Sequence, residues 1–435
     1  MFAILFFVLG LAQQGQAAMP VLARASSIAD QIIRGETAPV VAQFNDQLKA
    51  ALPEERLQQV GTSLTAQAGA FQQQTGLRLA EAPSGVSVVI VTCQFERASV
   101  DVVISFDAAN RMAGLQMRPT PSTAAYVAPA YVTPSSFSER DVTVDAGGWP
   151  LPGTLTMPTG TGPFPAVVLV HGSGPSDRDE TQGPNKPFRD LAWGLASRGI
   201  AVVRYDKRTM VHARRIVGVN DFTVGAEVVD DALAAVKVLR ETAGVKADRV
   251  FVVGHSLGGM LAPRIGAREP GLAGLVILAG ATQPLEVAIV RQTRYLAMLD
   301  GTITPAEQKQ IDAVVGLEAA VRAAKPGDPP IGVPPFVAPA SYWLDLRGYS
   351  PPASAKVLRQ PMLVLQGERD YQVTMDDFAA WRMALTGRDN VTLRSYPSLN
   401  HLFMPGSGAG NPMEYLQTSH VDGAVVADVA AWIAR

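Results

Sequence analysis

The chain contains 435 residues, of which 47% are hydrophobic and 17% are charged, so it is long enough for two domains with apolar cores. Its formal net charge of −2 gives no basic surface for a nucleic-acid partner. Cys93 is the only cysteine, which excludes an intrachain disulfide framework and a cysteine-based metal site, and no His, Asp or Glu cluster has metal-ligand spacing. We expect neither a cofactor nor a metal.

The first 17 residues have the pattern of a secretory signal peptide. An apolar run from Phe2 to Ala12 is too short to cross a bilayer, and Gly15 and Ala17 are small residues at the positions that a signal peptidase recognises. The usual Lys or Arg before the apolar run is absent, so a buried N-terminal helix is the alternative. We expect cleavage of 1–17, a secreted or periplasmic protein, and no stable membrane anchor after cleavage.

Residues 24–118 predict a small α+β domain. Apolar residues recur at helical intervals through an Ala-, Gln-, Leu- and Glu-rich stretch over 27–73, and three strands separated by polar turns follow at 86–95, 98–106 and 111–117. Helices followed by a meander of strands indicate one compact unit, which resembles an NTF2-like or cystatin-like sheet. Its apolar residues are explained as core, and we assign the domain no catalytic role.

A Pro- and Ser-rich stretch, residues 119–137, follows this domain. Proline restricts the backbone and small polar residues supply nothing to a core, so we predict a stiff, extended linker. The remaining residues, 138–435, alternate short apolar runs with helix-compatible stretches, which predicts a second, larger α/β domain.

A glycine-rich turn ends a predicted buried strand early in the second domain. The strand covers 165–170, and residues 171–175, HGSGP, follow it. No Gly-Lys-Ser or Gly-Lys-Thr string follows, which disfavours a phosphate-binding loop. A simple glycine turn is the alternative to a loop whose backbone amides face a reacting group.

The residues after this turn, 176–180, are unusually charged, with the sequence SDRDE. Acid-rich and base-rich loops at one end of a sheet tend to neutralise each other, so we expect ion pairs with Lys207 or Arg208. Such pairs contribute only about 0–1 kcal/mol each when they are exposed to solvent. The alternative is that the loop binds a charged group of the substrate.

The most informative pattern is GHSLGG at residues 254–259. It follows the apolar run 250–253 and precedes a helix-compatible stretch, 260–268, so a Gly-x-Ser-x-Gly turn joins a buried strand to a helix. A serine on such a turn has a strained backbone that exposes its Oγ, and the flanking glycines are needed because a Cβ would collide with neighbouring elements. We predict Ser256 as a nucleophile; the alternative is a glycine turn whose serine caps the helix.

An insertion over about 281–357 interrupts the alternation of strands and helices. Two helices are predicted in it, over 285–299 and 305–324, before a proline-rich run. An insertion at this point usually caps the active site and influences specificity. Tyr342 and Trp343 are candidate substrate-binding residues, with Leu344, Met298 and Phe336 as further candidates for the pocket lining. Packing of the cap onto the body is an equal alternative.

An acid is expected on a loop after the next strand. Serine nucleophiles on this kind of turn are followed along the chain by an Asp or Glu and then by a His, both after later strands. Residues 361–366 form a short apolar run, and Asp370 lies in the loop that leaves it. We predict Asp370 as the acid, with Glu368 and Asp376 as alternatives.

The base is chosen from only five histidines. His401 lies in a loop after the strand end at 393–396, where the order of the three groups requires a base. Two of the others belong to the glycine turns and two lie outside the expected loop: His171, His255, His212 and His420. We therefore predict His401 as the general base.

Acyl transfer also requires backbone amides that bind the oxyanion. The amide that follows the nucleophile, that of Leu257, supplies one donor, and the earlier glycine turn supplies the other. Ser173 is the first candidate in that turn and Gly174 is the second. Gly172 and His255 flank these groups and are candidate substrate-binding residues.

From residue 138 to the end, five strings in order resemble an α/β-hydrolase of the secreted bacterial esterase type. They are HGSG (171–174), YDKR (205–208), GHSLGG (254–259), GERD (367–370) and NH (400–401). The resemblance implies an α/β-hydrolase fold, with a mostly parallel sheet, helices on both faces and a helical cap insertion, and implies that Ser256, Asp370 and His401 form a triad. The N-terminal region likewise resembles the small domain of unknown function that precedes the hydrolase in some secreted esterases.

These residues predict a serine carboxylesterase that acts on small to medium acyl esters, with a small molecule as its partner. The same scaffold hosts several hydrolase activities, so a serine peptidase of the prolyl-oligopeptidase or aminopeptidase type is the alternative. The chain lacks a β-propeller-length N-terminal region and an obvious acidic pair that could bind a substrate amino terminus. A non-enzymatic exported binding protein is disfavoured by a complete triad, and the oligomeric state does not follow from the sequence.

Overall fold

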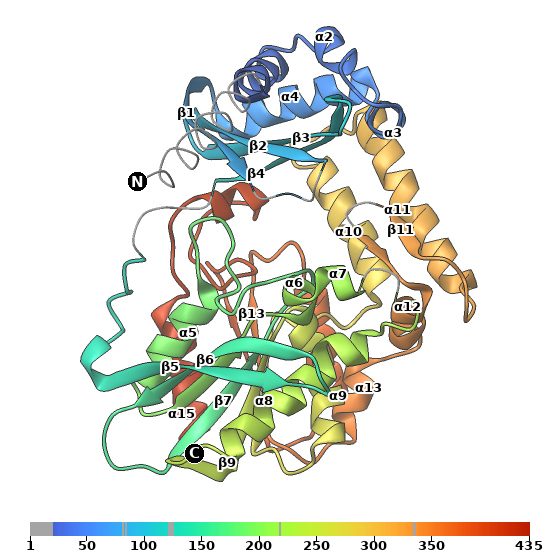
Figure 1. The fold of residues 1–435 in the computed structure, drawn as a ribbon. Coiled ribbons are helices and arrows are strands. Elements are labelled where there is room, and N and C mark those ends of the chain that lie inside the picture. The colour runs from blue at the N-terminus through green and yellow to red at the C-terminus, as the bar shows by residue number, and fades with distance from the viewer. Residues whose placement is uncertain (1–20, 81, 83–84, 121–125, 217–218, 334–335) are drawn as a thin grey trace, which may run out of the picture. The chain divides into compact units, whose positions relative to one another are not determined.

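The computed structural model describes residues 21–435 apart from 81, 83–84, 121–125, 217–218 and 334–335 (Figure 1). The chain forms two compact units, Met1–Ala125 with Tyr415–Gln417, and Tyr126–Glu414 with Thr418–Arg435. The boundary falls within the stretch that was predicted as a linker, and the predicted signal peptide, 1–17, lies outside the described residues. In the portion of the chain described, no helix has the length and apolar character needed to span a bilayer.

The small unit consists of short helices followed by a four-stranded antiparallel meander in the order β1-β2-β3-β4. Alternate residues of its central strands face the helices and form the core with them, as the period of two requires. Cys93 belongs to this core, and burial raises the pKa of its thiol to about 12, so the thiol stays protonated. The elements are a helix over 21–33, α2 (Ala38–Val41), α3 (Asp46–Ala51), α4 (Glu54–Ala68), β1 (Phe71–Ala80), β2 (Ser87–Phe95), β3 (Ser99–Phe106) and β4 (Met112–Pro119).

Strand β1 corrects the sequence interpretation, which continued the helical pattern to residue 73. Helix α4 ends at Ala68, and the next residue, Gly69, has a φ of +87° that suits glycine and turns the chain back. Phe71 then pairs with Phe95 of β2, and their rings meet edge to face at 5.6 Å. The glutamines of β1 hid this strand because polar residues on an edge strand weaken the apolar alternation.

The large unit is built on an eight-stranded sheet in the order β14-β13-β10-β9-β7-β8-β6-β5. The six strands from β14 to β8 are parallel, whereas β6 runs antiparallel to both β8 and β5. The mostly parallel α/β sheet predicted from the sequence is therefore confirmed. The strands are β5 (Phe137–Asp145), β6 (Pro150–Pro158), β7 (Phe164–Val170), β8 (Ala201–Tyr205), β9 (Val245–His255), β10 (Gly274–Leu278), β13 (Met362–Gly367) and β14 (Val391–Tyr396).

Helices cover both faces of this sheet (Figure 1). Val168 and Val252 of neighbouring strands face one core, and Val167 and Phe251 face the other, so the strands are apolar throughout. Burial of each such side chain contributes about 1.5–3 kcal/mol. One core contains residues of α8 (Asp230–Arg240), α9 (Leu257–Arg268), α13 (Pro351–Lys356) and α14 (Met375–Ala384), and the other contains residues of α5 (Pro187–Ala196) and α15 (Gly423–Ile433).

Short helical segments fill several connections of the large unit. They are η1 (Pro134–Ser136), α6 (Arg208–Val211), α7 (Ala213–Ile216), η2 (Gly225–Val229) and η3 (Pro412–Leu416). The segment η2 is a π-helical turn that leads into α8. Such turns are rare and occur frequently at functional sites.

The predicted cap lies between β10 and β13 and has a small core of its own. A capping box between Thr304 and Glu307, with proline at the first helical position, explains where its longest helix begins. The two predicted helices end within two residues of the observed ends, whereas the strand pair β11–β12 was not predicted. The elements are α10 (Leu285–Ala297), α11 (Pro305–Ala323), β11 (Ile331–Val333), β12 (Phe336–Ala338) and α12 (Ala340–Leu346).

Candidate active site

The serine turn lies between β9 and α9 and has the strained backbone that its sequence predicts. Ser256 has φ +53° and ψ −113°, a conformation that non-glycine residues rarely adopt. A Cβ at Gly254 would collide with the carbonyl of Gly258, and a Cβ at Gly258 would collide with the carbonyl of Val170 at the end of β7. The two glycines therefore allow the turn to lie directly against the end of the neighbouring strand.

The structure brings His401 and Asp370 together at the carboxyl edge of the same sheet. His401 Nδ1 lies 2.7 Å from Asp370 Oδ2, and both residues are buried. The Asp370 carboxylate also accepts hydrogen bonds from the amides of Gln372 and Val373 and from the side chain of Gln366. With Nδ1–H donating to the carboxylate, Nε2 of His401 is left to accept a proton.

The two alternative acids lie elsewhere. Glu368 is exposed and accepts a hydrogen bond from the hydroxyl of Ser395, and Asp376 is exposed in the first turn of α14. A Cβ at Gly367 would collide with the carbonyl of Leu399, so the loop after β13 and the loop that carries the histidine are in direct backbone contact. This contact places Asp370, and not its neighbours, beside the imidazole.

The glycine turn after β7 lies beside the serine. A Cβ at Gly172 would lie 3.2 Å from the Cβ of Ser256. The Gly172 amide donates to Glu180 Oε1 at 2.6 Å, and its carbonyl accepts from Lys207 Nζ at 2.7 Å. By contrast, within the described ranges the amide of Ser173 makes no hydrogen bond, and the amide of Leu257 is the first in α9 and has no intrahelical acceptor. The amide of Leu257 in the serine turn and the amide of Ser173 in the glycine turn are therefore both unpaired.

Glu180 and His255 form a buried ion pair that the sequence did not indicate. Glu180 Oε2 lies 2.9 Å from His255 Nδ1, and His255 Nε2 lies 2.9 Å from the carbonyl of His401. Burial alone would lower the pKa of His255, but the Glu180 carboxylate outweighs it and raises that pKa. Burial likewise opposes the charge on Glu180, yet His255 beside it holds the pKa of Glu180 below its usual value. This pair links the glycine turn, the serine turn and the histidine loop.

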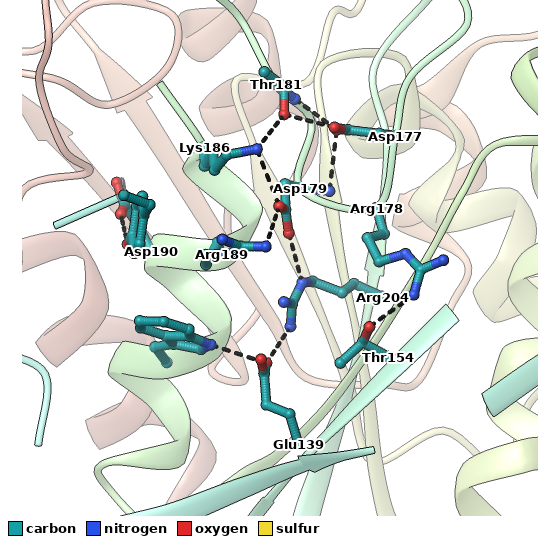
Figure 2. A network of polar contacts seen from close by, with 12 residues as sticks. Glu139, Thr154, Asp177, Arg178, Asp179, Thr181, Lys186, Arg189, Asp190 and Arg204 are labelled. Carbon is teal, nitrogen blue, oxygen red and sulfur yellow. Dashed lines mark hydrogen bonds and ion pairs between the residues drawn. The ribbon is translucent and has the colours of Figure 1, made fainter. Parts of the chain in front are cut away.

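The predicted ion pairs of the charged loop with Lys207 or Arg208 are wrong. Figure 2 shows Asp179 between Arg204 on one side and Lys186 and Arg189 on the other. Burial would raise the pKa of Asp179, but the three cations hold it below its usual value. The strand β8 directs Arg204 toward this loop, whereas Lys207, two residues beyond the strand, reaches Gly172 instead.

The two cap residues proposed for substrate binding are held by internal contacts. The Tyr342 hydroxyl donates to Glu227 Oε2 at 2.8 Å, and burial raises the pKa of Tyr342 well above its usual value. Trp343 is 2% exposed, lies in the core of the cap and donates its indole N–H to the carbonyl of Ile331. These contacts agree with packing of the cap, and a role of either residue in substrate binding stays a prediction.

A different surface of the cap forms an open, mostly apolar pocket of about 650 Å³. The ring of Tyr295 in this pocket stacks on Tyr371 at 5.2 Å, and Tyr371 directly follows Asp370. Of the lining residues only Met298 was a candidate from the sequence, because the residues that form the pocket are scattered over two helices and two loops. They are Arg294, Tyr295, Met298, Leu299, Ile303, Gln308, Ile311 and Ala409.

Family comparisons agree with the two-unit architecture. The family described as serine aminopeptidase, S33, matches residues 163–405, from β7 to the loop that carries His401. A family of unknown function, DUF3887, matches residues 25–115. The chain belongs to the S33 family of α/β-hydrolases. Across the described residues, no group of three or more His, Cys, Asp or Glu is placed to hold a metal ion.

Individual relatives of this S33 chain include Esterase EstD of Thermotoga maritima, which is 41% identical over 394 residues and 90% of each chain. By this relationship the chain is an esterase-type hydrolase. The 2,6-dihydropseudooxynicotine hydrolase of Paenarthrobacter nicotinovorans is 27% identical over 35% of this chain and 40% of its own length.

Two solved structures are also similar to this S33 hydrolase. Est1E from Butyrivibrio proteoclasticus is 16% identical, with a TM-score of 0.43 over 68% of this chain and 99% of its own. An esterase from Pyrobaculum calidifontis is 20% identical, with a TM-score of 0.44 over 68% of this chain and 85% of its own.

Proposed function

We propose that the chain is a serine carboxylesterase that cleaves esters of small to medium acyl chains, with Ser256 as nucleophile, His401 as base and Asp370 as acid. The observation that carries the proposal is the 2.7 Å contact of His401 Nδ1 with Asp370, at the sheet edge where the strained Ser256 turn also lies. The 41% identity to Esterase EstD supports the ester as substrate class.

The reaction follows from the roles of these groups. His401 Nε2 takes the proton of Ser256 Oγ as this oxygen attacks the ester carbonyl, and Asp370 holds the imidazole and stabilises its charged form. The tetrahedral oxyanion is bound by the amides of Leu257 and Ser173. His401 then protonates the leaving alcohol, and water, activated by the same base, hydrolyses the acyl-enzyme and restores Ser256.

A serine peptidase is the second candidate, because the matching family is described as a serine aminopeptidase. An aminopeptidase must bind a free amino terminus, which requires a carboxylate near the nucleophile. Glu180, the buried carboxylate beside Gly172, accepts from the Gly172 amide at Oε1, and its Oε2 lies 2.9 Å from Nδ1 of His255, a charge contact without hydrogen-bond geometry. This occupancy favours the esterase.

We also propose export of the chain, which rests on the signal pattern of residues 1–17.

A panel of p-nitrophenyl esters from C2 to C16 tests the proposal beside aminoacyl- and prolyl-anilides, with Ser256→Ala as the blank. We expect ester turnover that declines as the chain lengthens, and little anilide cleavage. Anilide cleavage that exceeded ester cleavage would replace the esterase by the peptidase, and turnover that survived in the blank would refute the nucleophile.

A further inference from the structure

The amide and carbonyl of Gly172 in the glycine turn are held by two buried charged side chains, one from the loop that follows the turn and one from beyond β8. Glu180 accepts from the Gly172 amide and Lys207 donates to the Gly172 carbonyl. Lys207 is 1% exposed, which is unusual for lysine and costs desolvation energy. Backbone groups of a loop at a sheet edge can usually bond to water, so this buried ammonium calls for a specific explanation.

The carbonyl that Lys207 holds belongs to the same peptide group as the amide of Ser173. A peptide group is planar and trans, so its C=O and N–H point in opposite directions. When the Gly172 carbonyl is fixed toward Lys207, the Ser173 N–H is fixed in the opposite direction within the peptide plane. The ammonium also polarises the peptide, which makes that N–H a stronger donor.

We propose that Lys207 is a positioning residue that orients the Ser173 amide toward the oxyanion. The proposal rests on the proposed function of Ser256, whose Cβ lies against Gly172. Lys207 does not touch the substrate in this account. It acts through one peptide group, and its contribution is confined to states in which the carbonyl oxygen of the substrate has become an oxyanion.

The ammonium of Lys207 is itself fixed by a second buried group. Lys207 Nζ lies 3.2 Å from Glu227 Oε1, and Glu227 also accepts from the hydroxyls of Thr209 and Tyr342, each at 2.8 Å. Glu227 lies on the π-helical turn η2, and Tyr342 lies on α12 of the cap. A side chain of the cap thus reaches the glycine turn through Glu227 and Lys207, which gives the buried Tyr342 hydroxyl a role in supporting the site.

The test compares two buried ion pairs that are adjacent in the sequence. Lys207→Met with Glu227→Gln removes the ammonium without leaving an unpaired charge. The Gln oxygen accepts from one of the hydroxyls of Thr209 and Tyr342, and its NH2 group donates to the other. The matched control is Arg208→Met with Asp231→Asn, which removes an equally buried ion pair that has no bond to the glycine turn. Wild-type ester turnover and phosphonate labelling of Ser256 are measured first, so that failure of the proposed function is recognised separately.

The readout distinguishes an oxyanion effect from general damage. Ser256 Oγ adds to the carbonyl carbon of an aryl trifluoromethyl ketone to form a hemiketal oxyanion. The matched aryl methyl ketone binds mainly as the ketone. For the Lys207 pair variant we expect kcat/KM to fall about 10–100-fold, less than the full loss of one donor. The Ki of the trifluoromethyl ketone should rise by the same factor, with the Ki of the methyl ketone unchanged. Lys207→Arg, which keeps a cationic donor, should restore part of the loss.

The proposal is overturned if the Lys207 pair variant stays within about threefold of the Arg208 control in kcat/KM. It is also overturned if both ketones weaken equally, because a merely structural role would give that result. If the pair variant does not fold, the single variant Glu227→Gln tests the proposal. It keeps Lys207 and the amides of Ser173 and Leu257 but removes the carboxylate that fixes the ammonium. A fall of about 3–10-fold in kcat at constant KM supports the proposal, and unchanged kinetics refute it.

Discussion

The carboxyl edge of the large sheet and the cap, which is the insertion between β10 and β13, differ in how their side chains are placed. At the sheet edge, strand pairing fixes each loop, and Asp370 and His401 meet where their strands end. In the cap, helices carry Tyr342 and Trp343 inward, to Glu227 and to the cap core. We infer that the edge determines whether an ester is cleaved at all and that the cap determines which ester is cleaved.

The largest effect is expected at the nucleophile. Ser256→Ala should lower kcat by at least about 10⁴-fold for every ester of the panel, because no other group can form the acyl-enzyme. Steady-state kinetics together with far-UV circular dichroism measure turnover and folding. A loss restricted to long or short chains would contradict the division between edge and cap.

The acid is the next group to test. Asp370→Asn should lower kcat by about 10³–10⁴-fold at neutral pH, because the amide no longer holds the Nδ1–H tautomer of His401. Asp376→Asn, an exposed neighbour on α14, serves as the control and should leave kcat within about twofold. Equal losses of kcat in the two variants would show that Asp370 is not the acid of the triad.

The backbone N–H of Ser173, which we propose binds the oxyanion, can be removed by a substitution at that residue alone. Ser173→Pro deletes the N–H and should lower kcat by about 10²–10³-fold. Ser173→Ala keeps the N–H and should retain nearly full activity. If alanine costs as much as proline, the hydroxyl rather than the amide of Ser173 is involved.

The buried Glu180–His255 pair should make stability depend on pH. The pKa of His255 is raised, so its contribution to the free energy of unfolding is fully present below about pH 6.5 and is lost as pH rises through the pKa of the folded state. The pKa of Glu180 is lowered, so its contribution is fully present above about pH 4.5 and is lost as pH falls through the pKa of the folded state. Glu180→Gln should therefore cost about 3–5 kcal/mol of unfolding free energy between these values, and less outside them. Urea unfolding across this range measures the difference, with Glu368→Gln as the exposed control, and a gap independent of pH would contradict the account.

The cap pocket should give the smallest and most selective effect. Leu299→Trp fills part of the pocket and should lower kcat/KM for C8 and longer esters by about 3–10-fold while C2 turnover is unchanged. Met383→Trp, on the exposed face of α14, is the control. A uniform loss across chain lengths would show that the pocket does not receive the acyl chain.

Elements whose position follows from backbone pairing could be predicted from the sequence. The glycines around Ser256 and the strand ends before Asp370 and His401 indicate their places because only a parallel sheet puts such ends at one edge. The cap orientation could not be predicted, since consecutive helical residues such as Tyr342 and Trp343 point in different directions and only one face can line a pocket. Nothing local to Glu180 or Lys207 indicates their partners, which lie far away in the sequence and are selected by packing.

The most direct test of the central claim is labelling with a fluorophosphonate, followed by peptide mass spectrometry, on the full-length folded protein. The account predicts one equivalent of phosphonate on Ser256, and loss of the label in the Ser256→Ala and His401→Ala variants, because only a serine activated by His401 attacks the reagent at neutral pH. Labelling at another residue, or labelling of Ser256 that persists without His401, would contradict the account.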